Sequence, residues 1–293
     1  MHATESDIDI GIDIDIAHAG TLPVLPLETA LAPEMTRFDA ATRFGVMSLQ
    51  VDGAPAANAA AAALLLDRCD ALLDALDAWL HVALDWRWVD AAPADQAPRP
   101  CASAQGAIDG DDSSAGALAW RLEVPWALLR SLSAPPESLA KHLQWGVVPA
   151  VLVVSQPAID EAELRLLERG GAVVLPESMR APWRGRMHAP QERAGDGLVV
   201  ELPAADSARL AAATMTTAGS SEPDGRPSCE VRMTTAAPVA PAQLAGWAPE
   251  STVDLAPRAS LWRCAGPTEP ERYLAGGRLL PWGDGWAMLI ESI

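Results

Sequence analysis

Lysine and asparagine are almost absent from this chain. Among 293 residues there is one lysine, Lys141, and one asparagine, Asn58. No glycine-rich loop precedes Lys141, so a P-loop nucleotide site is excluded, because that site needs a lysine on the phosphates. A single Asn58 within an alanine run likewise excludes chemistry that needs paired asparagines.

Motifs of catalytic and metal sites are also missing. The cysteines form no Cys-x-x-Cys pair and lie far apart, at Cys69, Cys101, Cys229 and Cys264, which argues against a zinc site or a disulfide framework. The five histidines show no i, i+4 pair, and there is no His-Glu-x-x-His, Gly-x-Ser-x-Gly or Gly-x-Gly-x-x-Gly motif. We therefore expect no catalytic, cofactor-binding or metal-binding residues and predict that the protein is not an enzyme. Carboxylates are plentiful, so an unrecognised carboxylate hydrolase stays open as an alternative.

Basic residues are outnumbered by acidic ones. Lys and Arg total 21 and Asp and Glu total 39, a net charge of −18 at neutral pH. This charge disfavours nucleic acid and anionic lipid and favours a basic protein partner. There is no apolar run of about 18 residues and no signal-peptide pattern at the N-terminus. We expect a cytoplasmic protein that neither inserts into a membrane nor binds nucleic acid.

The N-terminal half is predicted to contain an α/β domain. Residues 1–20 form an acidic strand or tail, because aspartate and isoleucine alternate from Asp7 to Ile16. Residues 56–81 carry the clearest helical pattern, with an apolar stripe opposite an acidic one; the stripes are Leu65, Cys69, Leu72, Leu76 and Trp79, and Asp67, Asp70, Asp74 and Asp77. A short strand-like piece follows at 84–89, and residues 91–118, which lack periodicity, are expected to be a flexible loop. We place this domain at 21–145.

The second half contains an internal repeat. Short strands are predicted at 151–154, 172–175 and 198–202, with a short helix at 161–168. A shift of 80 residues places Val231 on Val151 and Val253 on Val173, and the Gly-Asp-Gly triplets at 195–197 and 283–285 each lead into an apolar strand. We predict a duplication, with one copy at 146–205, a linker at 206–228 and a second copy at 229–293. Copies this small cannot bury a large core alone, so we expect them to pair with each other.

The second copy resembles the SpoA (surface presentation of antigens) domain. The matching stretches are a first strand at 229–232, a short helix near Leu244, the segment Val253-Asp254-Leu255, and a glycine-containing strand before Gly283-Asp284-Gly285. The copy departs from the family pattern at 249–251, where a Gly-Asp turn is usual. Two such copies behind an α/β domain resemble the Q component of type III secretion systems, a cytoplasmic-ring protein related to flagellar motor-switch proteins. The resemblance implies an α+β fold, with an α/β N-terminal domain followed by two small β-rich SpoA-like domains that pair with each other.

The same resemblance implies a structural subunit of the cytosolic sorting platform beneath a secretion channel. Its implied partners are the L-type regulator and through it the secretion ATPase, export substrates with their chaperones, the basal-body ring and other copies of itself. It also implies a peripheral position on the inner-membrane apparatus, and a short C-terminal product that could start at Met215, otherwise an ordinary linker methionine. A soluble secretion adaptor or chaperone outside the ring is the other open interpretation.

Tryptophans and a basic cluster supply the candidate partner contacts. Eleven Trp residues accompany two Phe and one Tyr, and Trp is favoured at interface hot spots. The candidates are Trp247, Trp262, Trp282 and Trp286, together with Arg180, Trp183 and Arg184. The alternatives are that these rings fill the core of a chain poor in Phe, and that the basic cluster is a solvated loop. We expect Trp247 in the core and Trp282 at the surface.

Overall fold

A computed structural model of the protein describes residues 35–53, 55–90, 100–108, 117–190, 192, 197–210, 229–265 and 270–293. These residues belong to one compact unit, Glu34–Ile293. The alternating segment at 7–16 and most of the predicted linker, including Met215, lie outside the described residues.

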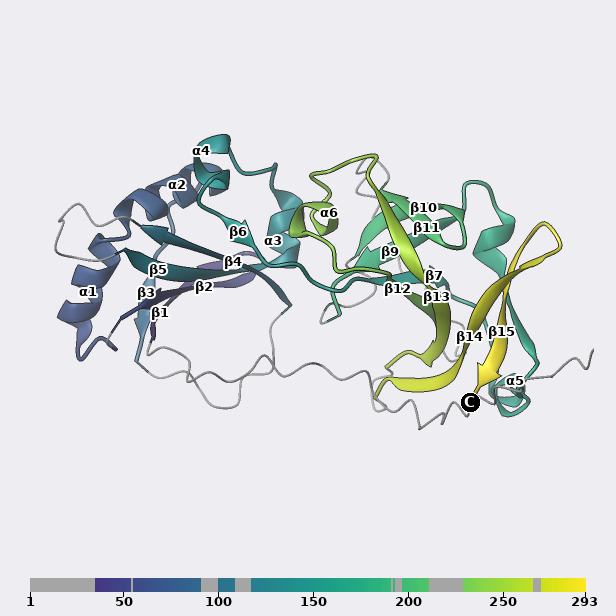
Figure 1. Cartoon of the computed structure of the whole chain (residues 1–293). Helices are drawn as coiled ribbons and strands as arrows, with labels where there is room; N and C mark the ends of the chain where they lie inside the picture. The colour runs from purple at the N-terminus through teal and green to yellow at the C-terminus, as the bar shows by residue number, and fades with distance from the viewer. Residues whose placement is uncertain are drawn as a thin grey trace, which may run out of the picture. The chain divides into compact units, whose positions relative to one another are not determined.

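The first part of the unit is a six-stranded sheet with the strand order β3-β1-β2-β5-β4-β6. The strands are β1 (Met35–Thr42), β2 (Gly45–Asp52), β3 (Arg87–Val89), β4 (Cys101–Ile108), β5 (Leu118–Pro125) and β6 (Gln144–Trp145). The helices are α1 (Ala59–Asp67), α2 (Asp70–Leu80), α3 (Trp126–Ser131) and α4 (Glu137–Ala140). Figure 1 shows α1 and α2 lying along this sheet. Every pairing between its described strands is antiparallel, as expected for a sheet with one covered face.

The predicted helical pattern at 56–81 forms two helices in place of one. The chain breaks between Asp67 and Asp70, and Cys69 stands at the N-cap of α2. The predicted apolar stripe is confirmed, because Cys69 and Leu76 have no exposed surface and Trp79 is 4% exposed. Burial raises the pKa of the Cys69 thiol to about 11, so this cysteine behaves as a core residue rather than a nucleophile.

A regular strand, β4, lies inside the stretch that the sequence predicts to be a loop. Its buried positions are the small residues Ala102 and Ala104, which alternate with Cys101 and Ser103. The strand is inserted between β5 and β6 and pairs with β5 along its whole length. Alanine, serine and glycine form this strand because its neighbours supply the packing that its own side chains cannot.

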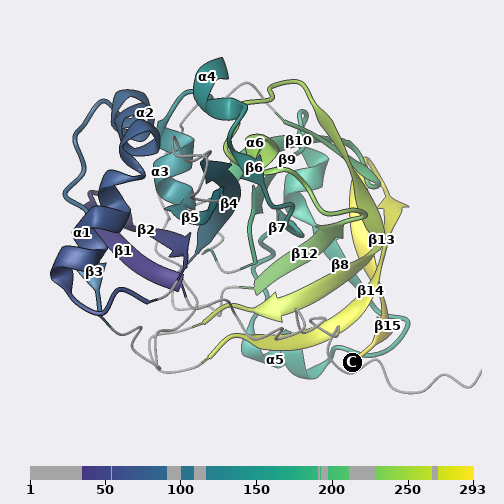
Figure 2. The same ribbon diagram turned by 60° about the vertical axis from the view of Figure 1, so that its left-hand side comes forward.

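The second part of the unit is a nine-stranded sheet with the order β11-β10-β9-β7-β12-β13-β14-β15-β8. The strands are β7 (Val151–Ser155), β8 (Ala172–Leu175), β9 (Arg184–His188), β10 (Leu198–Ala204), β11 (Ser207–Leu210), β12 (Cys229–Thr235), β13 (Thr252–Arg263), β14 (Arg272–Trp282) and β15 (Gly285–Ser292). The helical turns are α5 (Glu161–Arg165), η1 (Pro176–Met179) and α6 (Pro241–Leu244). An additional pairing of β11 with β13 closes six of these strands into a barrel. Figure 2 shows the long β14–β15 hairpin beside β13.

The duplication is visible in this sheet as an exchange of strands. Ala208 of β11 pairs with Val253 of β13, and Met288 of β15 pairs with Val173 of β8. Both members of the second pair are the first pair shifted by 80 residues, so each half lends its last strand to the other half. The first strands of the two halves, β7 and β12, also pair antiparallel with each other. Helices α5 and α6 begin 80 residues apart, at Glu161 and Pro241.

The two Gly-Asp-Gly triplets do not occupy matching places, contrary to our alignment. The triplet at 283–285 forms the turn between β14 and β15, where Gly283 adopts a φ of +58°. In the first half the matching turn lies between Ala204 and Ser207, in the β10–β11 hairpin. Gly197 instead comes directly before β10. The triplet is therefore a coincidence of a glycine-rich composition, and the 80-residue register alone relates the last strands.

The predicted fold class is wrong. The structure is mostly β, and its first part is an antiparallel sheet with helices rather than an α/β domain. The second part is not a pair of small domains, because its strands merge into one large sheet that includes a closed six-stranded barrel. The reason is physical: each copy leaves unpaired strand edges, and their hydrogen-bond partners lie in the other copy.

Candidate protein-interaction surfaces

The predicted basic cluster divides into a buried tryptophan and exposed arginines. Trp183 is 6% exposed, and its indole Nε1 donates a hydrogen bond of 2.9 Å to the carbonyl oxygen of Val154. Its ring stacks on that of Trp286, with centroids 6.2 Å apart. Arg180 and Arg184 are exposed. These two arginines stay available to an acidic partner, whereas Trp183 and Trp286 bind the β8–β9 connection to β15.

Trp247 joins the two parts of the unit. Its Nε1 donates a hydrogen bond of 2.9 Å to the carbonyl oxygen of Leu132. Its ring makes edge contacts with Trp79 and Trp145, at centroid distances of 5.8 and 6.2 Å. The side chain is thus committed to an internal contact, as we expected for a core residue.

A buried ion pair lies at the same junction. The guanidinium of Arg130 makes two hydrogen bonds with the Glu192 carboxylate, of 2.6 and 2.7 Å, and the two side chains are 9% and 4% exposed. Nε of Arg130 also donates to the carbonyl oxygen of Leu244, at the end of α6. Sequence reasoning missed this pair because the residues are 62 positions apart.

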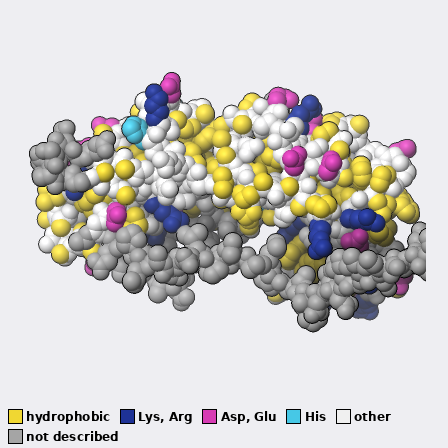
Figure 3. Space-filling view, in the orientation of Figure 1, with side chains coloured by type: hydrophobic (Ala, Val, Ile, Leu, Met, Phe, Trp, Pro, Cys, Tyr) yellow, Lys and Arg dark blue, Asp and Glu magenta, His cyan; other side chains and the backbone are white. Residues whose placement is uncertain are grey.

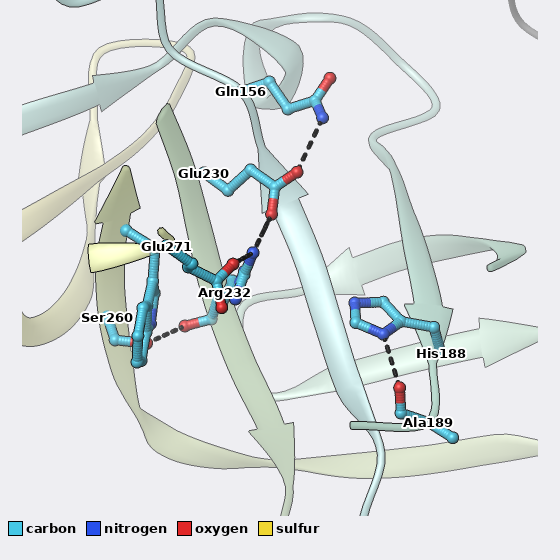
Figure 4. Close-up of polar contacts among 8 residues, drawn as sticks. Gln156, His188, Ala189, Glu230, Arg232, Ser260 and Glu271 are labelled. Carbon is cyan, nitrogen blue, oxygen red and sulfur yellow. Dashed lines mark hydrogen bonds and ion pairs between the residues drawn. The ribbon is translucent and has the colours of Figure 1, made fainter. Parts of the chain in front are cut away.

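Trp262 covers a second polar cluster, shown in Figure 4. Its ring lies 5.4 Å from the guanidinium carbon of Arg232. Arg232 forms ion pairs with Glu230, at 2.6 Å, and with Glu271. Nε2 of Gln156 donates to the remaining oxygen of Glu230 at 3.2 Å, which ties β12 to the end of β7.

These charges stabilise one another within the sheet. Burial lowers the pKa of Arg232, but the carboxylates of Glu271 and Glu230 outweigh burial and raise it overall, so the arginine stays charged. The alternation Glu230-Val231-Arg232 could have indicated the pair, because alternate residues of a strand share a face. The cluster fills its own hydrogen-bonding capacity, which makes it a structural feature of the sheet.

His188 is a buried titratable group close to this cluster (Figure 4). It is 3% exposed, and its Nδ1 donates to the carbonyl oxygen of Ala189 at 2.8 Å, while Nε2 has no partner among the described residues. Burial lowers the pKa of His188. The ring is therefore neutral at pH 7 and belongs to the core.

Trp282 is the candidate that faces solvent. It lies next to the β14–β15 turn and is 51% exposed. On the face drawn in Figure 3, charged side chains are sparse and separated by apolar ones. Of the four tryptophans first singled out, only Trp282 presents most of its ring to a partner.

Three further results bear on function. In the described part of the chain, no group of three or more His, Cys, Asp or Glu side chains is arranged to hold a metal ion. No helix among the described residues is long and apolar enough to cross a membrane. No protein-family model, curated protein or solved structure matches the chain.

Proposed function

We propose that this protein is a structural subunit of the cytosolic ring, or sorting platform, of a bacterial type III secretion system. The observation that carries the proposal is the strand exchange between the two related halves. Each half leaves strand edges that only a second, similar half can pair, as β8 pairs with β15 and β11 with β13. Such isologous pairing is how subunits assemble through self-complementary surfaces.

The sequence motifs give this scaffold its proposed setting. Val253-Asp254-Leu255 and the strand before Gly283-Asp284-Gly285 resemble the Q component of the secretion apparatus. The net charge of −18 supports binding to basic protein surfaces. On this proposal the protein acts without catalysis and without a cofactor. It would work in the cytoplasm, at the inner-membrane apparatus, and bind the L-type regulator, the ATPase through it, and export substrates with their chaperones.

A short product starting at Met215 would fit the same proposal. It would contain β12 to β15 but lack β7, β8 and β11, which pair with β12, β15 and β13 in the full chain. Three strand edges would then be open, and a second short product would satisfy them in the same way. We therefore expect any such product to be a dimer or to join the full-length chain.

A secretion assay tests the proposal. Deleting the gene from its host should abolish export of all type III substrates while signal-peptide-dependent export continues, and the full chain should restore it. Loss of one substrate alone would instead indicate an adaptor that serves a single client. Unchanged export of every substrate would refute the proposal.

A further inference from the structure

The two halves of the nine-stranded sheet differ in what covers their helices. On α6, residues from the first part of the unit form the cover. Val148 pairs with Val239 through two backbone hydrogen bonds, of 2.8 and 3.0 Å, just before this helix. Arg130 donates to the carbonyl oxygen of Leu244 at its end, and Trp247 packs beyond it.

A shift of 80 residues carries this covered surface onto α5. Val239 corresponds to Ile159, Leu244 to Leu164, and Trp247 to Leu167. Among the described residues, none pairs with Ile159 as Val148 pairs with Val239. The surface on α5 is therefore the counterpart of an occupied docking surface.

This surface is hollowed into a groove of about 560 Å³, which we call the α5 groove. Its apolar lining includes Pro157, Ile159, Leu166, Leu167, Val174 and Ile290. Leu166 is 76% exposed, an unusual state for a leucine beside other apolar side chains. One wall is β8, the last strand of the sheet order, which pairs with β15 on one side.

The charge of the groove limits what can occupy it. Glu163 and Glu168 line it, and no lysine or arginine is among its lining residues. The aspartates of the chain's own segment at 7–16 would meet these carboxylates, and so would a second copy of a chain with net charge −18. A basic occupant is favoured over either of them.

We propose that the α5 groove binds an extended segment of a separate basic protein, which places aliphatic side chains in the groove and arginine beside Glu163 and Glu168. The pattern copies the cover of α6, where Val148 supplies the extended residue and Arg130 supplies the guanidinium. The inference depends on the proposed function only in that the chain works by binding proteins. It adds the place and the chemistry of one partner.

A peptide-binding measurement on the full-length chain tests this inference. The probe is a fluorescent peptide with the sequence of residues 144–150, flanked by one added arginine at each end, and its anisotropy reports binding. The variant Leu166→Asp should weaken binding about tenfold or more. Leu64→Asp is the matched control, because Leu64 is 68% exposed on α1, and it should leave binding unchanged.

Charge reversal provides the second arm. Glutamates in place of the two added arginines should abolish binding to the natural chain, and Glu168→Arg should restore binding of the acidic peptide. Equal binding by Leu166→Asp and the natural chain, or no binding at about 1 mM basic peptide, would overturn the proposal.

Two other occupants have their own signatures. Binding that appears only after removal of residues 1–33 would assign the groove to the chain's own N-terminal segment and overturn the proposal. Self-association lost in Leu166→Asp would assign it to a second copy, with the same consequence. None of these results depends on whether deletion of the gene stops secretion, so the two proposals can fail separately.

Discussion

Replacing Trp247 with alanine tests whether this tryptophan is an internal anchor or a partner contact. The indole contacts the rings of Trp79 and Trp145 and donates a hydrogen bond to the Leu132 carbonyl oxygen. Trp282 is the matched control, because it is 51% exposed beside a turn.

The expected cost of Trp247→Ala follows from these contacts. Each edge-to-face aromatic pair contributes about 0.5–1.5 kcal/mol, and the hydrogen bond about 1 kcal/mol. Lost apolar burial adds to these, which agrees with the usual cost of about 3–5 kcal/mol for truncating a packed Trp. Since Trp247 is only partly buried, we expect about 3 kcal/mol. Trp282→Ala should change stability by less than about 0.5 kcal/mol.

Thermal unfolding followed by tryptophan fluorescence and circular dichroism is the assay. A loss of about 3 kcal/mol should lower Tm by about 6–12 °C for Trp247→Ala. Trp247→Phe keeps a ring but loses the indole N–H, so it should lie between the natural chain and the alanine variant. A Tm for Trp247→Ala within about 1 °C of that for Trp282→Ala would refute the assignment of Trp247 to an internal contact.

Three more predictions concern the large sheet. Gly277→Ala should destabilise the protein by about 3 kcal/mol or more, because the new Cβ would overlap the backbone carbonyl of Leu289; Gly276→Ala meets only the ends of flexible side chains and should cost less, so equal Tm values would contradict the packing. Stability should fall as pH drops from about 7 to 5, because burial lowers the pKa of His188 below 6.5 and the unfolded chain takes up the proton first. His188→Phe should flatten that slope in urea titrations, and an unchanged slope would refute the assignment. A protease site placed within 211–228 and then cut should leave two pieces that co-elute in native buffer and separate in denaturant, and separation in native buffer would contradict the strand exchange.

Local patterns predicted the elements whose side chains carry a strong signal. The stripe through Leu72, Leu76 and Trp79 predicted a buried helix face, because large apolar residues at helical spacing leave few alternatives. The strand β4 went unnoticed because Ala102 and Ala104 alternate with residues equally small, and such a sequence looks like a loop. Its strand conformation is set by pairing with β5.

Long-range pairing decided what the sequence could not. The 80-residue repeat was found from apolar spacing, but nothing near Ala208 or Met288 indicates that each pairs with a strand of the other half. The tryptophans illustrate the same limit. Trp183 and Trp282 both stand next to a proline in the sequence, yet one is 6% exposed and the other 51%.

The most direct test of the central claim is purification of the full-length chain from its host cytosol, with mass analysis of what accompanies it. As a ring subunit the chain should bring with it a secretion ATPase and the ATPase's L-type regulator, in a complex larger than a monomer. Recovery of the chain alone and monomeric, under conditions that preserve known secretion complexes, would contradict the account.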